Sequence, residues 1–224
     1  VSHDLKSPLV TISGFLSVLK EDLQTQRYDR VSDSMMRLER ASRRMEQLIN
    51  DLLQLSRVGL VELEFEVLDL RSLLLGICET LAPQISEKNA QVVIAREMPK
   101  LIADKKWVYQ IFENLIINAL KYACEKPGAK IEIGADRSDT EILFYVKDQG
   151  PGIAKEYHQK IFGLFQRLEA DSRGTGVGLA IVSRAMQLHG GRAWVESQPK
   201  QGASFWLAFP ILHKPVDRLI GSPR

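Results

Sequence analysis

Three polar side chains share one face of a helix that the sequence predicts from about Asp104 to Ala123. Asn114, Asn118 and Lys121 stand at i, i+4 and i+7, which places them on the same side of an α-helix. Amide oxygens are hard ligands that suit Mg²⁺, and a lysine one turn further along can reach a phosphate. The opposite side is apolar, with Ile111, Leu115, Ile116 and Leu120. Taken alone, an exposed polar face without a ligand is the commoner explanation of such a pattern.

The segment VKDQGPGIA places an acid at the end of a predicted strand, with two glycines behind it. Gly150 and Gly152 flank a proline, and glycine permits positive φ and a close approach of the backbone to a ligand. The carboxylate of Asp148 can accept a hydrogen bond from an amino group such as that of adenine. By itself, the segment is more typical of a turn between two elements.

The segment SRGTGVGLAIVSRAM has three glycines, Gly174, Gly176 and Gly178, in front of an apolar helix. Glycine-rich backbone at a helix N-terminus can bind an anion. A dinucleotide fold would need a strand before the glycines, and the polar LEADSR is not one, although Glu196 stands at a suitable distance for a ribose acid. A Walker-type phosphate loop is excluded because no Gly-Lys-Ser or Gly-Lys-Thr is present.

A histidine that can act as a nucleophile begins the chain's first predicted helix, in SHDLKSPL. A neutral imidazole is a competent nucleophile near pH 7, since its ordinary pKa is about 6.5. Ser7 lies one turn after His3 on the same face, and Pro8 removes the backbone bond to the carbonyl of Asp4, which should kink the helix there. The ordinary explanations are a surface histidine and an acid favoured by the helix dipole.

The first 58 residues predict a helical hairpin. Apolar residues follow a heptad rhythm on either side of QTQRYDR: Leu5, Leu9, Ile12, Leu16, Leu19 and Leu23, then Val31, Met35, Leu38, Met45, Ile49 and Leu52. Two helices with so broad an apolar face cannot bury it alone, so we expect a second copy to complete a four-helix bundle. Without His3, a plain coiled-coil dimerisation module would explain these residues as well.

The rest of the chain mixes helices and strands without regular alternation. Strands are predicted at 62–67, 90–97, 129–136, 141–148, 191–198 and 203–210, and a helix capped by Asp69 is predicted to extend to about residue 89. This order predicts an α+β sandwich, with one sheet and helices on one of its faces. The tail from residue 214 has little core material, and we expect it to be loose.

Composition narrows the possible functions. The chain has 224 residues and a formal net charge of +2, which argues against a dedicated nucleic-acid-binding protein. Cys78 and Cys124 suggest neither a metal site nor a secreted disulfide framework, so we expect a reducing, cytoplasmic location. No apolar run approaches the roughly 18 residues of a membrane span. We expect the chain to be a piece of a longer protein, which can itself be membrane-anchored, and to lack an upstream sensor domain.

The order of these motifs resembles the catalytic domain of sensor histidine kinases, which belong to the GHKL ATPase superfamily. Asn114 to Asn118, Asp148-Gln-Gly-Pro-Gly152, IFGLFQRLE and Gly174-Thr-Gly-Val-Gly178 are similar to its N, G1, F and G2 boxes. SHDLKSPL resembles the H box of the helical hairpin that dimerises and accepts the phosphoryl group. The resemblance covers residues 1 to about 210 and implies a four-helix bundle followed by the Bergerat ATP-binding fold.

The resemblance implies a role for each matching residue in the binding of ATP and Mg²⁺. Asn118 should chelate the metal with help from Asn114, Lys121 should contact phosphate, and Tyr122 should pack against the nucleotide. Asp148 should bind the adenine amino group in a pocket that the glycines of its loop shape. The remaining assignments are Phe162 and Phe165 as anchors of a lid at about residues 153–173 that orders when ATP binds, Arg167 as a contact of the γ-phosphate, and Gly174, Gly176 and Gly178 as the lid hinge and phosphate cradle.

The resemblance also implies that His3 receives the γ-phosphoryl group of ATP and passes it to an aspartate of a response-regulator receiver domain. Asp4 should hold the imidazole tautomer that leaves Nε2 free to attack. Ser7 stands where threonine or asparagine is common, which leaves phosphatase activity toward the regulator open. The expected domains are the hairpin at 1–58, a joint at 59–66, the ATP-binding domain at 67–213 and a tail at 214–224.

Two other functions remain open on the sequence. One is a nucleotide-binding regulatory module that forms heterodimers with another kinase and transfers no phosphoryl group. The other is an ATPase of the gyrase or chaperone type, but Asn114 stands where such enzymes would place the acid that activates water. The sequence identifies neither the sensed signal nor the cognate regulator, and it does not decide between transfer within one chain and transfer across a dimer.

Overall fold

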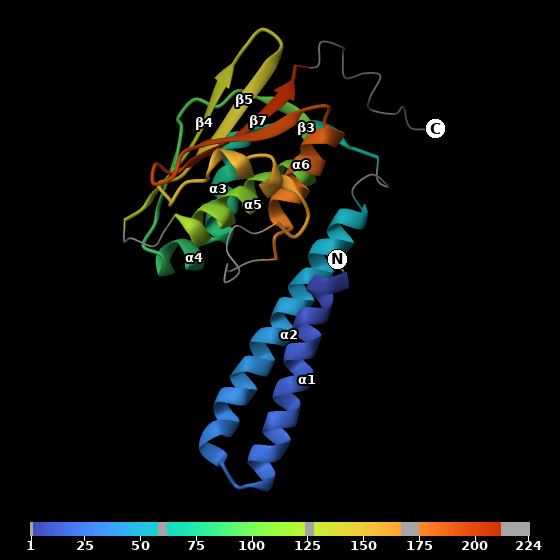
Figure 1. The fold of residues 1–224 in the computed structure, drawn as a ribbon. Coiled ribbons are helices and arrows are strands. Elements are labelled where there is room, and N and C mark those ends of the chain that lie inside the picture. Colours follow the sequence, from blue (N-terminus) through green and yellow to red (C-terminus); the bar gives the residue numbers. More distant parts are fainter. Residues whose placement is uncertain (1, 58–61, 124–127, 167–174, 212–224) are drawn as a thin grey trace. The chain divides into compact units, whose positions relative to one another are not determined.

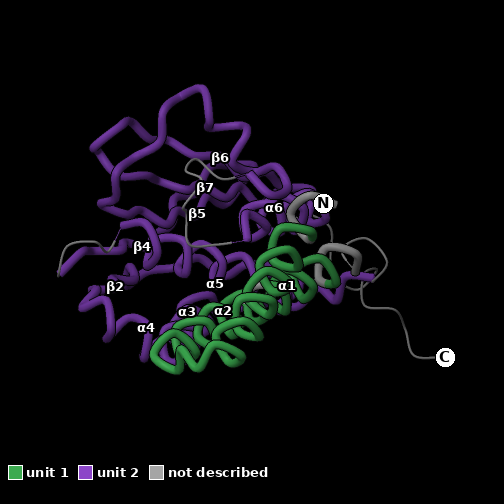
Figure 2. Tube along the Cα trace, turned by 60° about the horizontal axis from the view of Figure 1, so that its bottom comes forward, with its two compact units in different colours: residues 1–56 green, residues 57–224 purple. Residues whose placement is uncertain are grey.

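The chain forms two compact units, residues 1–56 and residues 57–224, which Figure 2 colours separately. The structure is a computed structural model, and it describes residues 2–57, 62–123, 128–166 and 175–211. The division between the units lies close to the expected end of the hairpin at residue 58; the other domain limits stay predictions. Within the residues described, no helix is long and apolar enough to cross a membrane.

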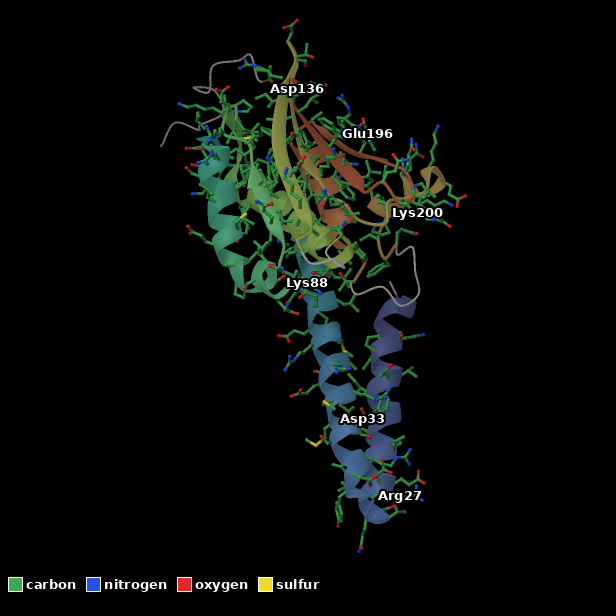
Figure 3. All side chains as sticks on the ribbon, turned by 90° about the vertical axis from the view of Figure 1, so that its left-hand side faces the viewer. Arg27, Asp33, Lys88, Asp136, Glu196 and Lys200 are labelled. Atoms are coloured by element: carbon green, nitrogen blue, oxygen red, sulfur yellow. The ribbon has the colours of Figure 1, made fainter. Side chains whose placement is uncertain are left out.

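The first unit is an antiparallel pair of helices, α1 (Ser2–Gln24) and α2 (Tyr28–Arg57). The chain reverses between them at Gln26, which has a left-handed φ of 57°, and Arg27 N donates to the carbonyl of Asp22 at 2.8 Å. The guanidinium of Arg37 on α2 lies 5.4 Å from the ring centre of Phe15 on α1, which joins the helices by a cation–π contact. Figure 3 shows Arg27 near the turn and Asp33 further along α2.

The heptad rows of the hairpin divide into a covered row and an exposed row. The covered positions are at least half-buried in the single chain: Ile12, Leu19, Val31, Leu38, Met45 and Leu52. The other positions, each seven residues or a multiple of seven apart on its helix, are exposed: Leu9, Leu16 and Leu23 on α1, Met35 and Ile49 on α2. One hairpin therefore leaves one of its two heptad rows uncovered.

The second unit contains a five-stranded mixed sheet in the order β2-β4-β5-β7-β6. Its strands are β2 (Gln91–Ile94), β4 (Lys130–Arg137), β5 (Glu141–Lys147), β6 (Arg192–Ser197) and β7 (Ala203–Pro210). β2 runs parallel to β4, and the other neighbours are antiparallel. Helices cover one face of this sheet, as predicted (Figure 1).

Two predictions about the start of this unit were wrong. A separate two-stranded sheet pairs β1 (Phe65–Leu68) with β3 (Leu101–Asp104), so the strands do not all join one sheet. The helix expected to extend to about residue 89 is two helices, α3 (Leu70–Thr80) and α4 (Ala82–Glu87). Pro83 lies in the first turn of α4 and has no N–H to continue α3, which explains the break.

The helical layer contains α5 (Lys105–Tyr122) and α6 (Gly178–Leu188), which lie against each other beneath the sheet (Figure 1). The inward face of α5 is fully buried at Ile111, Phe112 and Ile116. The ring of Phe112 meets that of Phe144 from β5 edge to face, and Phe144 meets Phe209 from β7 in the same way. This aromatic row fixes which side of α5 turns away from the sheet.

Asp104 connects the N-terminus of α5 to the segment just before β1 by hydrogen bonds. Its buried carboxylate accepts from the N–H groups of Lys106 at 3.0 Å and Trp107 at 3.2 Å, the geometry of an N-cap. Its second oxygen accepts from the N–H of Glu64 at 3.0 Å, in the segment that leads from the hairpin into β1. The exposed cap of α3, Asp69, accepts from the N–H and the hydroxyl of Ser72.

We predict that Asp104→Ala lowers the free energy of unfolding by about 2 kcal/mol or more, because three main-chain N–H groups lose their acceptor in a buried place. Asp69→Ala is the matched control, and it should cost less because water can replace its cap. Urea unfolding of both variants measures the difference. Equal losses of unfolding free energy in the two variants would show that the hydrogen bonds of Asp104 matter no more than those of an exposed cap.

Candidate functional site

The polar face of α5 lies on the side of the helix away from the sheet, as the spacing predicted. Asn114 and Asn118 are partly exposed and Lys121 is exposed, whereas the four apolar residues assigned to the other side are buried. Nδ2 of Asn114 donates to the carbonyl of Gln110 at 2.8 Å, and its Oδ1 faces the N-terminus of α6 at Gly178. Among the described residues, the side-chain amide of Asn118 makes no hydrogen bond, so it is available to a ligand.

Asp148 directly follows β5 and is buried beside the G1 glycines. Its Oδ1 accepts from the N–H of Gly150 at 2.8 Å and of Ala203 at 3.2 Å. Burial raises the pKa of Asp148, and these two hydrogen bonds oppose the rise. Within the described residues no bond reaches Oδ2, so one oxygen of an oriented carboxylate remains to accept from a ligand.

Two glycines mark places where separate motifs approach each other around α5. A Cβ on Gly150 would lie 3.2 Å from both the carbonyl oxygen of Tyr122 and Cα of Ala123, so the loop after β5 packs on the end of α5. A Cβ on Gly178 would lie 2.7 Å from Oδ1 of Asn114, so the N-terminus of α6 meets the middle of α5. The contacting segments lie far apart in the sequence, so the sequence alone could not reveal either contact.

The F-box segment reaches the same N-terminus of α6. The short 3₁₀ turn η1 (Lys155–Tyr157) precedes it, and a second, η2 (Lys160–Phe162), begins it and packs on α6. Phe165 has a left-handed φ of 58°, rare for an aromatic residue. Gly176 has a φ of 74°, and a Cβ there would lie 2.9 Å from the carbonyl carbon of Phe165. Phe165, inside the predicted lid, therefore lies next to Gly176, just beyond its C-terminal end.

A turn between β6 and β7 supports the G1 loop, and sequence reasoning missed it. Gly152 has a φ of 73°, and a Cβ there would overlap the carbonyl oxygen of Gln198. The hydroxyl of Ser197 accepts from Ile153 N at 2.8 Å and donates to the carbonyl of Gly202 at 2.5 Å. The sequence signal was only a turn composition, QPKQG, with nothing to indicate its partner.

Some predicted site residues fall outside the described residues. These are Arg167 and Gly174, together with the side chains of His3 and Asp4. The backbone places His3 and Asp4 in the first turn of α1, and the helix continues through Pro8. Ser7 is exposed one turn later.

The arrangement can hold an elongated, anionic ligand. Asp148 offers a fixed acceptor at one end of α5, Asn114 and Asn118 offer amide oxygens along it, and the N-terminus of α6 lies beside Asn114. The glycines at the crossings leave room for backbone to approach the ligand. This combination of acceptor, amide oxygens and helix N-terminus suits a nucleotide polyphosphate.

Comparison with known protein families assigns a separate family to each of the two units. Residues 103–213 match the family described as histidine kinase-, DNA gyrase B-, and HSP90-like ATPase. Residues 1–60 match the His Kinase A (phospho-acceptor) domain. The two units therefore form the catalytic core of a sensor histidine kinase, and the chain belongs to that family.

Individual relatives extend the similarity over the whole core. The methanogenesis regulatory histidine kinase FilI of Methanothrix harundinacea is 36% identical over 210 residues, 94% of this chain and 24% of that protein. Full-length ShkA, solved with AMPPNP, is 28% identical with a TM-score of 0.67, covering 92% of this chain and 45% of that one. Histidine kinase ThkA, in complex with response regulator protein TrrA, is 25% identical with a TM-score of 0.72, covering 95% and 60%. The chain thus spans less than half the length of FilI and ShkA.

We predict that Asp148→Asn weakens nucleotide binding but does not reduce stability at neutral pH. The raised pKa of Asp148 means that ionisation disfavours the folded state, so the stability contribution is present at low pH and is lost as pH rises through the raised pKa. The stability of Asp148→Asn relative to the parent should therefore increase between pH 4 and pH 8 in urea unfolding. A variant that is clearly less stable than the parent at pH 8 would contradict the inferred cost of the buried carboxylate.

We predict that Gly178→Ala weakens nucleotide binding by roughly tenfold, because its Cβ would overlap Oδ1 of Asn114 and displace that side chain or α6. Gly76→Ala is the matched control, since a Cβ on this helical glycine meets nothing within 4 Å. The control should bind nucleotide normally and be more stable by about 0.5–1 kcal/mol. Calorimetric titration with Mg-AMPPNP measures binding; equal affinity for both variants would overturn the close fit assigned to Gly178.

Proposed function

We propose that this chain transfers the γ-phosphoryl group of ATP to His3 and then to an aspartate on the receiver domain of a response regulator. The observation that carries the proposal is the convergence of the N, G1, F and G2 segments around α5 and the N-terminus of α6. The His Kinase A domain at residues 1–60, with His3 in the first turn of α1, supplies the acceptor. The complex of ThkA with TrrA supports a receiver domain as the partner.

Adenine would lie at the end of α5 where Asp148 is held. Oδ2 of Asp148 would accept a hydrogen bond from the exocyclic amino group of the base, which guanine does not present at that position. Gly150 and Gly152 keep the loop flat against its neighbours, and Tyr122, which is 38% exposed, offers a ring beside it. Two main-chain donors orient the carboxylate in advance, which lowers the cost of ordering it on binding.

The triphosphate would lie along the polar face of α5 toward the N-terminus of α6. Asn118 would hold Mg²⁺ with help from Asn114, and these neutral oxygen donors fit a magnesium ion that also takes phosphate oxygens and water. When bound, Mg²⁺ neutralises charge on the phosphates during transfer. Lys121, Arg167 and the N–H groups at the start of α6 would contact the remaining phosphate oxygens, with Gly174 and Gly176 giving the lid room to close.

Transfer would begin with Nε2 of His3. A bond forms between Nε2 and the γ-phosphorus, the bond from that phosphorus to the bridging oxygen breaks, and ADP leaves. Asp4 would accept the hydrogen bond from Nδ1–H, fix the tautomer and stabilise the positive charge that develops on the ring. In the second step the N–P bond breaks as a receiver carboxylate takes the phosphoryl group. Ser7, exposed on the same face, would orient water if the core also dephosphorylates the regulator.

A homodimer accounts for the exposed heptad row of the hairpin. Leu9, Leu16 and Leu23 form a line of apolar side chains on α1, each 48–52% exposed, and Met35 and Ile49 continue the pattern on α2. A second copy would cover this row in a four-helix bundle. We place the core in the cytoplasm with a sensor upstream in the parent protein.

The second candidate function is a nucleotide-binding regulatory module that transfers nothing. It predicts binding of ATP without modification of His3, which separates it from the kinase in a single assay.

We predict that the chain, incubated with γ-labelled ATP and Mg²⁺, acquires label that acid removes and alkali does not. His3→Gln should remain unlabelled while it still binds nucleotide, and Asn118→Ala should lose both labelling and tight binding. Label on His3→Gln would contradict the assigned acceptor. A parent chain that binds ATP but stays unlabelled would favour the regulatory module.

A further inference from the structure

A buried histidine at the end of α6 has no part in the proposed chemistry. His189 is 6% exposed and lies directly after the last residue of α6. The ring of Phe65 from β1 and the ring of Phe209 from β7 each lie 5.7 Å from it, edge to face. A polar ring in such surroundings needs partners for both of its nitrogens.

The two hydrogen bonds of His189 fix its charge and its tautomer. The N–H of Asp104 donates to Nε2 at 3.1 Å, and because a main-chain N–H can only donate, Nε2 carries no proton. Nδ1 lies 2.7 Å from the carbonyl oxygen of Ala185 and therefore donates to it. The ring is neutral, in agreement with the direction of its pKa, which burial lowers against the opposing effects of Ala185 and Asp104.

These bonds join the beginning of α5 to the end of α6. Asp104 is the N-cap residue of α5, and Ala185 lies in the last turn of α6. At the other end of α6, Gly178 lies against Asn114 in the middle of α5. The helices are thus in contact at two places, one inside the candidate nucleotide site and one outside it.

We propose that His189 is a positioning residue for the nucleotide site: it sets how α6 lies along α5. The inference rests on the proposed function, because it matters only if Asn118 on α5 and the N-terminus of α6 bind the same triphosphate. A small slide of one helix along the other would separate those ligands, and misplacement by about 1 Å can cost a large factor in rate or affinity. His189 acts through Asp104 and α6, and it touches no substrate.

The first arm of the test compares two substitutions in the full chain. His189→Gln keeps an acceptor for the N–H of Asp104 and a donor for Ala185, whereas His189→Leu fills space and leaves that N–H buried without a partner. We expect His189→Leu to bind Mg-AMPPNP roughly tenfold more weakly than the parent, and His189→Gln to bind nearly as well as the parent. Circular dichroism at the titration temperature ensures that folded protein is compared.

Ile142→Val is the control for general loss of stability, since Ile142 is buried in β5 on the sheet. It should unfold at lower urea and bind Mg-AMPPNP normally. If His189→Leu binds as tightly as the parent and differs only in stability, His189 is a structural residue and the proposal is overturned. If the parent itself binds no Mg-AMPPNP, the nucleotide site is wrong and both proposals fall together.

The second arm uses pH. Protonation of Nε2 removes the acceptor for Asp104, and Asp104 is the charged group, among those described, that acts on the ring. The parent should lose affinity for Mg-AMPPNP as pH falls below the ordinary range of histidine, more steeply than His189→Gln does. Titration of the nucleotide is common to both proteins and cancels in the comparison. Identical pH curves would overturn the role of the neutral ring.

Discussion

The burial of one side of α5 is the constraint on which the rest of the site depends. Ile111, Phe112 and Ile116 are completely buried, and the edge-to-face contact of Phe112 with Phe144 ties the helix to the middle of the sheet. Because an α-helix cannot turn one side inward without turning the other outward, this packing presents Asn114, Asn118 and Lys121 away from the sheet. The energy that orients the polar face thus comes from apolar contacts on the opposite face.

A second constraint is the close approach of neighbouring segments, which explains why glycines lie where the segments cross. Gly150 meets the end of α5, Gly176 meets Phe165, and Gly178 meets Asn114. A Cβ on Gly150 or Gly176 would crowd backbone atoms of the neighbouring segment, and a Cβ on Gly178 would displace Oδ1 of Asn114, a proposed ligand. The turn between β6 and β7 supports the loop after Asp148 in the same manner, through Gly152 and Ser197.

The sequence was sufficient for features with a local or periodic signal. The spacing on α5, the cap at Asp69, the heptad rows and most strands follow from such signals, and the order of the boxes identified the family. The sequence was insufficient for strand pairs and hydrogen bonds whose two partners are far apart in the chain. β3 is only four residues long, and its pairing with β1 has no local mark. The bond from Ala203 to Asp148 spans 55 residues and that from Asp104 to His189 spans 85, so composition could not reveal either.

Hydrogen exchange of the full chain, with and without Mg-AMPPNP, tests the central claim most directly, because it locates the nucleotide without altering any residue. The account predicts slower exchange in three separated stretches: the second half of α5, the loop at 148–153 and the start of α6. The outer strand β2 and the turn of the hairpin should be unaffected. Protection confined to other parts of the chain, with none at these three, would contradict the site that the fold and the motifs define.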